Sequence, residues 1–165
     1  MKVIGRLFGV LMLGWIATMG IAATVALQKK REAPPVPDPE ADEIDLRTYF
    51  GPMEFASVAP AFRGGTIETW FGGGTLDLRG ATLHPEGATL HTTTVFGGGQ
   101  ILVPDSWVVE TRVIGIGGAG DVRGSAAATP ESDPAAPRLV VEGLVAFGGF
   151  GIMSHDPRPV ETLTV

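Results

Sequence analysis

The 165-residue chain contains 24 glycines, 13 prolines and no cysteine, and its 18 acidic side chains outnumber the 12 basic ones. The lack of cysteine excludes disulfides, Cys-ligated zinc, iron–sulfur clusters and thiol nucleophiles. From Glu32 onward, 18 acids stand against seven arginines and no lysine, a formal charge of −11 that would repel a phosphate backbone. We therefore expect one β-rich domain with many tight turns and no affinity for nucleic acid.

Residues 1–27 are expected to form an N-terminal transmembrane anchor. The uncharged run from Leu7 to Leu27 has 21 residues, which as a helix would span about 30 Å, the thickness of a hydrocarbon core. The alternatives are a cleaved signal peptide and a buried soluble helix. The run is longer than the apolar region of a signal peptide, and the basic residues 29–31 follow it directly. We expect a single-pass protein of a bacterial cell membrane that contacts the lipid bilayer through this segment.

Basic residues flank both ends of this segment, so the charge rule leaves open on which side of the membrane the rest of the chain lies. Residues 28–48 are rich in proline and acids and are expected to be a semi-stiff linker. A β-repeat domain is expected over 49–156, with a mobile low-complexity loop at 124–137, and a tail over 157–165.

A short glycine-rich turn recurs along this domain, each time between two β-rich runs. The turns begin at five positions that lie 21, 25, 20 and 31 residues apart: Phe50, Phe71, Phe96, Ile116 and Phe147. The last interval exceeds the others because it contains the low-complexity loop. A unit near 20 residues that cannot bury its own apolar face suggests a solenoid-like stack of short β repeats. The alternative is an antiparallel β-sandwich with glycine-rich hairpins.

Alternation of apolar residues along the runs predicts which side chains face the core. Leu90, Thr92, Thr94 and Phe96 fall on one side, so the turn phenylalanines are expected to be core residues that end a strand. Keeping Ile116 in the same phase would turn Glu110 and Arg112 inward, which predicts a β-bulge between Val109 and Ile116.

No motif predicts a catalytic, cofactor-binding or metal site, and we expect no enzyme. Residues 115–120 fit the pattern G-x-G-x-x-G, but glycines and prolines follow where a dinucleotide site needs a helix. His84, His91 and His155 lack the spacing of a zinc site. Ser154-His155-Asp156 reads as a hydrolase triad, yet consecutive side chains diverge and a nucleophile elbow is missing. Trp107, after a turn at residues 104–106, is expected to lie in the core.

Three segments, FGGGTLDLRGA (71–81), VFGGGQILVPDSW (95–107) and LVVEGLVAFGGFGI (139–152), resemble in this order the C-terminal domain of LiaF-like proteins, the cell-wall-active antibiotics response family. The likeness covers roughly residues 60–153. It implies a β-rich domain linked to a membrane region, with a regulatory role in envelope-stress signalling through a membrane sensor kinase. This chain departs from the family's best-known members in having one span instead of several.

Three functions of different classes remain. The first is a non-enzymatic, membrane-anchored envelope protein that acts as a regulatory or protein-interaction module in the cell-envelope stress response. The second is a structural scaffold that self-associates through the ends of its β stack. The third is a glycan-binding β-helix, for which Tyr49, Trp70 and Trp107 are the candidate stacking residues.

Overall fold

The structure is a computed structural model that describes residues 2–117, 119–123 and 137–155. The loop and tail expected at 124–137 and 157–165 lie outside the described residues, apart from Pro137. The chain divides into a helical unit, residues 1–33, and a β unit, residues 34–165. The elements are α1 (Lys2–Glu32), β1 (Glu43–Tyr49), β2 (Pro52–Ala56), β3 (Gly64–Trp70), β4 (Gly73–Asp77), β5 (Ala88–Val95), β6 (Gly98–Pro104), β7 (Val108–Ile116), β8 (Ala119–Arg123), β9 (Arg138–Ala146) and β10 (Gly149–His155).

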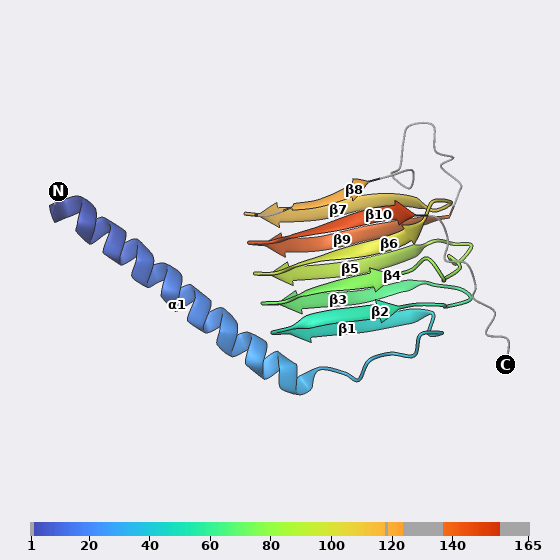
Figure 1. Ribbon diagram of the computed structural model, residues 1–165, viewed down its shortest axis with the longest axis horizontal. Helices are drawn as coiled ribbons and strands as arrows, with labels where there is room; N and C mark the ends of the chain where they lie inside the picture. Colours follow the sequence, from blue (N-terminus) through green and yellow to red (C-terminus); the bar gives the residue numbers. More distant parts are fainter. Residues whose placement is uncertain (1, 118, 124–136, 156–165) are drawn as a thin grey trace. The chain divides into compact units, whose positions relative to one another are not determined.

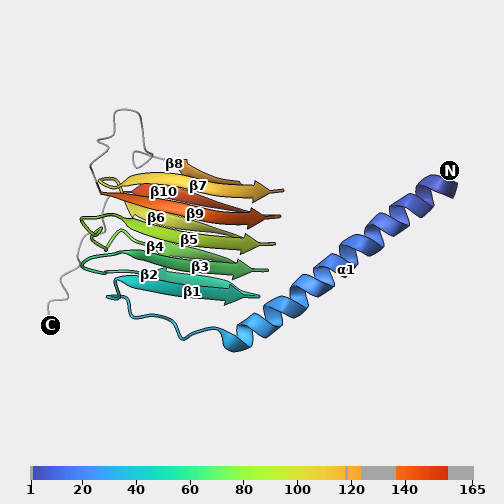
Figure 2. The same ribbon diagram turned by 180° about the vertical axis from the view of Figure 1, so that it is seen from behind.

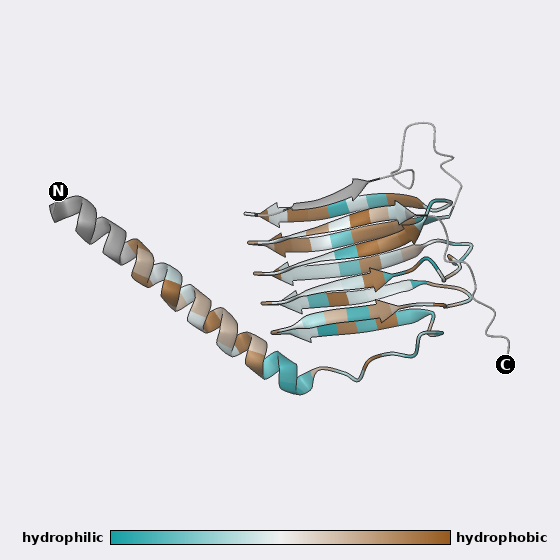
Figure 3. Cartoon of the chain, in the orientation of Figure 1, coloured by the Kyte–Doolittle hydropathy of each residue, from teal (hydrophilic) through white to brown (hydrophobic). Residues whose placement is uncertain are grey.

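The helix α1 is long and apolar enough to cross a membrane. Within Leu11–Glu32, an 18-residue stretch has a mean hydropathy of 1.6. Its last turn carries Lys29, Lys30 and Arg31, a favourable place for cations because the carboxyl end of a helix is negative. Figure 3 shows the hydrophobic stretch and the hydrophilic end that follows it.

The segment between helix and strands is shorter than the linker expected at 28–48, because α1 continues to Glu32 and β1 begins at Glu43. Part of it is also fixed to the β unit. The backbone oxygen of Pro39 accepts a hydrogen bond from the amide of Val58, and that of Asp42 accepts one from Arg63. This leaves residues 33–38 as the connection, which can span about 20 Å when extended.

The prediction of a mainly β domain is confirmed, and the alternative of an antiparallel sandwich is wrong. The odd-numbered strands form one five-stranded sheet in the order β1-β3-β5-β9-β7, called sheet A, and the even-numbered strands form sheet B in the order β2-β4-β6-β10-β8. Within each sheet, every two hydrogen-bonded neighbouring strands run parallel. Figure 1 shows the reason: each glycine-rich turn carries the chain from one sheet to the other, so no hairpin forms within a sheet.

We use the term strand pair for an odd strand and the even strand that follows it in the chain; its two strands lie in different sheets. Along the sheets these pairs do not follow the order of the sequence. The pair β9–β10 lies between β5–β6 and β7–β8, so the last strands of the chain are interior and β7–β8 forms one end of the stack. The view from behind in Figure 2 shows the same arrangement. The chain returns from β8 to β9 through the stretch that lengthened the last repeat interval.

The core lies between the two sheets, and along β5 and β9 it is built from alternate residues. Leu90, Val141 and Val145 of sheet A are fully buried, as are Leu76 and Ile152 of sheet B. Burying a side chain of this size contributes about 1.5–3 kcal/mol. The predicted inward phase of β5 is confirmed for Leu90, Thr92 and Thr94. Trp107 is 7% exposed and stacks on Phe62, with ring centroids 6.2 Å apart.

The predicted bulge in β7 is wrong. Its register with β9 runs without interruption from Val108 opposite Arg138 to Ile116 opposite Ala146. Ile116 therefore corresponds to the last strand residue of the other pairs and not to their phenylalanine. The residue at the phenylalanine position is Gly117, with φ 64°.

Candidate functional site

The most distinctive surface feature is a column of four phenylalanine rings at the turns between the sheets. Phe50, Phe71, Phe96 and Phe147 stack in that order, with centroids 5.2, 5.2 and 5.0 Å apart and planes within 13° of parallel. We call this column the Phe ladder. The turns themselves are linked, because each Phe amide donates a hydrogen bond to the residue that ends the neighbouring odd strand.

The expectation that these phenylalanines are core residues is wrong. All four have positive φ, between 50° and 57°, so each leaves the alternation of its strand and turns its ring out of the sandwich. Phe50 and Phe147, at the ends of the ladder, are 40% and 50% exposed. A left-handed conformation costs a residue with a Cβ about 1–2 kcal/mol. Ring stacking, at about 0.5–1.5 kcal/mol a pair, offsets that cost.

Close stacking of the turn backbones explains why glycine follows Phe71, Phe96 and Phe147. A Cβ on Gly72 would lie 2.3 Å from the backbone oxygen of Gly51, one on Gly97 2.3 Å from that of Gly72, and one on Gly148 1.9 Å from that of Gly97. No side chain can be accommodated at these distances. The Phe-Gly sequence is therefore a device that brings the rings into register.

An apolar surface adjoins the ladder on sheet A. Strand register aligns the final residues of its strands in one row: Tyr49, Trp70, Val95, Ala146 and Ile116. Leu144 and Ile114 are aligned two residues earlier on β9 and β7. Ile114 is 68% exposed and Ile116 54%. We call the ladder together with these seven residues the apolar margin of sheet A. Tyr49 is only 4% exposed, so the exposed patch consists of Ile114, Ile116 and the two ends of the ladder; such patches commonly mark interaction sites.

The opposite part of the same outer face is charged. Asp45 pairs with Arg47 at 2.7 Å, Glu110 with Arg112 at 2.8 Å, and His91 lies with Nδ1 3.2 Å from a carboxylate oxygen of Glu142. The outer face of sheet A is therefore charged toward the start of its strands, and the charge extends to Arg47, which lies in register with Leu144 and Ile114.

A buried carboxylate fixes two of the aromatic residues in this margin. Glu68, 7% exposed, accepts hydrogen bonds from the hydroxyl of Tyr49 at 3.1 Å and from Nε1 of Trp70 at 2.7 Å. Burial, and then the hydrogen bond to Glu68, raises the pKa of Tyr49 to about 12. The tyrosine is therefore neutral at physiological pH and remains a hydrogen-bond donor.

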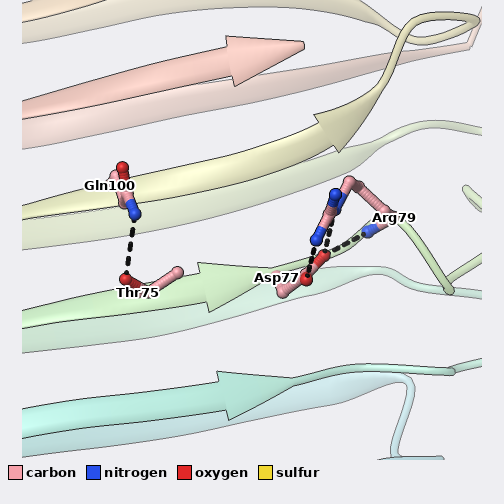
Figure 4. A network of polar contacts seen from close by, with 4 residues as sticks. All are labelled: Thr75, Asp77, Arg79 and Gln100. Carbon is pink, nitrogen blue, oxygen red and sulfur yellow. Dashed lines mark hydrogen bonds and ion pairs between the residues drawn. The ribbon is translucent and has the colours of Figure 1, made fainter. Parts of the chain in front are cut away.

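The outer face of sheet B has a different character. Figure 4 shows two contacts on it: Gln100 donates a hydrogen bond to Thr75, and Asp77 receives three from the backbone and side chain of Arg79. The Asp77 carboxylate raises the pKa of Arg79 further. Next to Thr75 lies an open depression of about 370 Å³, floored by glycines and flanked by Glu54, Gln100 and two methionines. It contains no aromatic ring on which a sugar could stack.

The structure separates the residues that suggested reactive chemistry. The glycines of the G-x-G-x-x-G pattern lie at the end of β7, in the turn and in β8, so a strand follows where a dinucleotide site requires a helix. His84 contacts Arg63, at 2.6 Å between ring and guanidinium nitrogens, whereas His91 lies with Glu142. Ser154 and His155 are neighbours on β10, and Asp156 lies outside the described residues. Among the described residues, no three His, Asp or Glu side chains gather where a metal ion could bind.

Sequence reasoning found the phenylalanine turns but missed the surface that they form. The signal that could have revealed it was the pair of glycines after Phe71, Phe96 and Phe147, because two small residues permit the stacking of successive turns. Comparison with models of known protein families finds no match, and comparisons with curated proteins and with solved structures find none either.

Proposed function

We propose that this chain is a non-enzymatic, membrane-anchored protein of the bacterial cell envelope, and that its β unit is a protein-interaction module with a regulatory role in the envelope-stress response. We interpret its two parallel sheets as a solenoid-like stack, a rigid scaffold that presents one edge of aligned rings. The observation that carries the proposal is the apolar margin of sheet A, with Ile114, Ile116 and both ends of the Phe ladder at least 40% exposed.

The partner we propose is an apolar helix surface of another membrane protein, such as a membrane sensor kinase. Two features support this choice. The connection over residues 33–38 has a maximum reach of about 20 Å, so the β unit cannot extend far from the end of α1. The margin itself offers aromatic and branched apolar side chains, which pack against helices by area and not by charge. The resemblance to LiaF-like proteins supports the same role.

Photocrosslinking from the full-length chain in its native membrane tests this proposal. A photoreactive phenylalanine analogue at Phe50 or Phe147 keeps a ring in the ladder, and the same analogue at Thr75 on sheet B is the matched control. We expect the first two positions, and not the third, to crosslink to one membrane protein of defined mass. A product of twice the chain's mass, without any crosslink to a second protein, would refute the proposed partner.

Crosslinking must be matched by a functional effect. We expect Phe50→Ser and Ile116→Ser to change the response of an envelope-stress reporter to a cell-wall-active antibiotic, because both side chains are exposed and contribute little to the core. Thr75→Ala should leave the response unchanged. The proposed role would be refuted if all three variants gave the same response as the unaltered chain, or if cells that lack the chain gave that response.

A further inference from the structure

The two ends of the β stack are protected to different degrees. At the first end, β2 begins with Pro52, which has no amide hydrogen to offer a neighbouring strand, and β1 carries charges at Glu43, Asp45 and Arg47. Pro39 and Asp42, which precede β1, also accept backbone hydrogen bonds from Val58 and Arg63. Proline and charge are common means of preventing an edge strand from pairing with another chain.

The other end lacks these protections on its longer strand. Within the described part of the chain, β7 pairs with β9 on one side and has no strand on the other. It has nine residues, contains no proline, and carries charge only at Glu110 and Arg112. An exposed edge of this length, flanked by apolar side chains, favours the addition of a further strand.

One polar atom in this edge strand is unusual. Thr111 Oγ1 is buried, and among the described residues it is the only buried side-chain nitrogen or oxygen without a hydrogen-bond partner. A buried hydroxyl left unpaired is unfavourable, because it has lost its hydrogen bonds to water without gaining others. Thr111 aligns with Val141 of β9, which offers no side-chain acceptor, and a strand added on the open side of β7 would supply the missing partner.

The sequence of β7 is symmetric about this same residue. From Val108 to Ile114 it reads V-V-E-T-R-V-I, with Thr111 at the centre and opposite charges on either side. If two copies of β7 lay antiparallel about a twofold axis at Thr111, each Glu110 would face the other copy's Arg112. Val109 would face Val113, and Val108 would face Ile114. Inward residues would meet inward residues, so the core would continue across the junction.

We propose that two copies of this chain associate through β7, in an antiparallel pairing centred on Thr111 that joins their A sheets into one. Directly opposed residues in such a pair have Cβ atoms about 4.5–5.5 Å apart, close enough for the two threonine hydroxyls to bond to each other. The contact is self-complementary, as a twofold dimer requires. It also covers Ile114. Among the large apolar side chains that the structure describes in the β unit, only Val36 is more exposed. This association does not depend on the partner proposed above.

Head-to-tail stacking of β7 on the next copy's β1 is the competing arrangement, and the residues disfavour it. In continuous parallel register Thr111 would face Ile44, which has no polar side-chain atom to bond the threonine hydroxyl. The contact would also involve the first end of the stack, where Pro52 and the charges of β1 oppose the addition of a strand.

Disulfide trapping tests the geometry, and the chain's lack of cysteine makes every introduced thiol unique. In the full-length chain in membranes, we expect Thr111→Cys to form a covalent dimer on mild oxidation. Mixed Arg112→Cys and Asp45→Cys chains, the matched control, should remain uncrosslinked to each other. A Thr111→Cys chain that stays monomeric, or efficient crosslinking in the mixture, would overturn the proposal.

Charge variants test the register independently of any thiol. Glu110→Arg alone, or Arg112→Glu alone, sets like charges against each other twice per dimer, and we expect the dissociation constant to rise by about tenfold. Mixing the two variants restores opposite charges in the heterodimer only. Light scattering in detergent should therefore show dimers in the mixture and monomers in each variant by itself. Dimers of equal strength in all three samples would refute the register.

Discussion

The ring of Phe147 lies against Gly117, the residue that takes the phenylalanine position in the last strand pair: a Cβ on Gly117 would lie 3.1 Å from Cδ1 of that ring. Gly117 keeps the positive φ of the four phenylalanines without their side chain. The ladder therefore ends one pair before the stack does, and one face of the Phe147 ring is left open. Its 50% exposure follows from this ending.

Gly97→Ala should lower the free energy of unfolding by about 2–3 kcal/mol, because its methyl group would overlap a backbone oxygen that cannot move without displacing the neighbouring turn. The measurement is denaturant unfolding of the full-length chain in detergent. Gly51→Ala is the control, since Gly51 occupies the same turn position in the first pair and has no atom within 4 Å of its added Cβ. Equal losses in the two variants would contradict the close stacking of turns.

Phe96 allows the ring stacking and the backbone strain to be separated. Phe96→Ala removes two stacking contacts and keeps a Cβ at positive φ, so we expect a loss of about 2–3 kcal/mol. Phe96→Gly removes the same contacts but relieves the strain, and it should be more stable than the alanine variant by about 1 kcal/mol. A glycine variant less stable than the alanine variant would be inconsistent with the left-handed conformation at this position.

The single tyrosine of the chain can be titrated without interference from others. We expect its phenolate absorbance to appear with a midpoint near pH 12, because the pKa of Tyr49 is raised to about 12 from an ordinary value of 10.0. Above pH 10 the unfolded chain loses this proton while the folded chain keeps it, so the stability that depends on it is present below pH 10 and is lost between pH 10 and 12.

Glu68→Gln is the matched variant for that titration. The amide keeps an acceptor for the Tyr49 hydroxyl but removes the negative charge that opposes formation of a phenolate, so the pKa should fall towards the ordinary value. A midpoint near pH 10 in the unaltered chain, or no change on substitution, would show that Glu68 does not hold the tyrosine.

Asp77 and Asp45 offer a comparison of the same ion pair in two environments. Each binds an arginine two residues later through two side-chain nitrogens, but the Asp77 side chain is 4% exposed and that of Asp45 is 42%. Asp77→Asn should destabilise the chain by about 2–3 kcal/mol, since the buried carboxylate that accepts three hydrogen bonds is lost and the partly exposed guanidinium of Arg79 loses its counterion. Asp45→Asn should cost less than about 1 kcal/mol, because solvent screens an exposed pair. The measurement is thermal unfolding of the two variants under the same conditions. Equal losses of stability would contradict this difference.

Much of the fold could be predicted from the sequence because local patterns specify it. Alternation along β5 placed Leu90, Thr92 and Thr94 in the core, and the recurrence of glycines located all five turns, including the first one at Phe50. The apolar run likewise identified the helix. These features depend on residues close together in the chain, where spacing alone carries the information.

The errors concern relationships between distant residues. Whether Phe96 faces in or out depends on a backbone angle that is tolerable only because Phe71 and Phe147 lie on either side of it. The bulge predicted in β7 rested on treating Ile116 as equivalent to those phenylalanines, an equivalence that register with Ala146 shows to be wrong. For the same reason, the apolar margin could not be recognised, since its members come from five strands.

The interior position of β9 and β10 has a consequence for the order in which the protein is made. A chain emerging from the ribosome delivers β7 and β8 before the strands that connect them to the rest of the stack. The only sheet neighbours of β7 and β8 among the described strands are β9 and β10, so neither strand can pair until β9 and β10 have been synthesised. Folding of this protein therefore cannot be completed progressively behind the ribosome, and a chain interrupted before Arg138 would expose the apolar edges of two unfinished sheets.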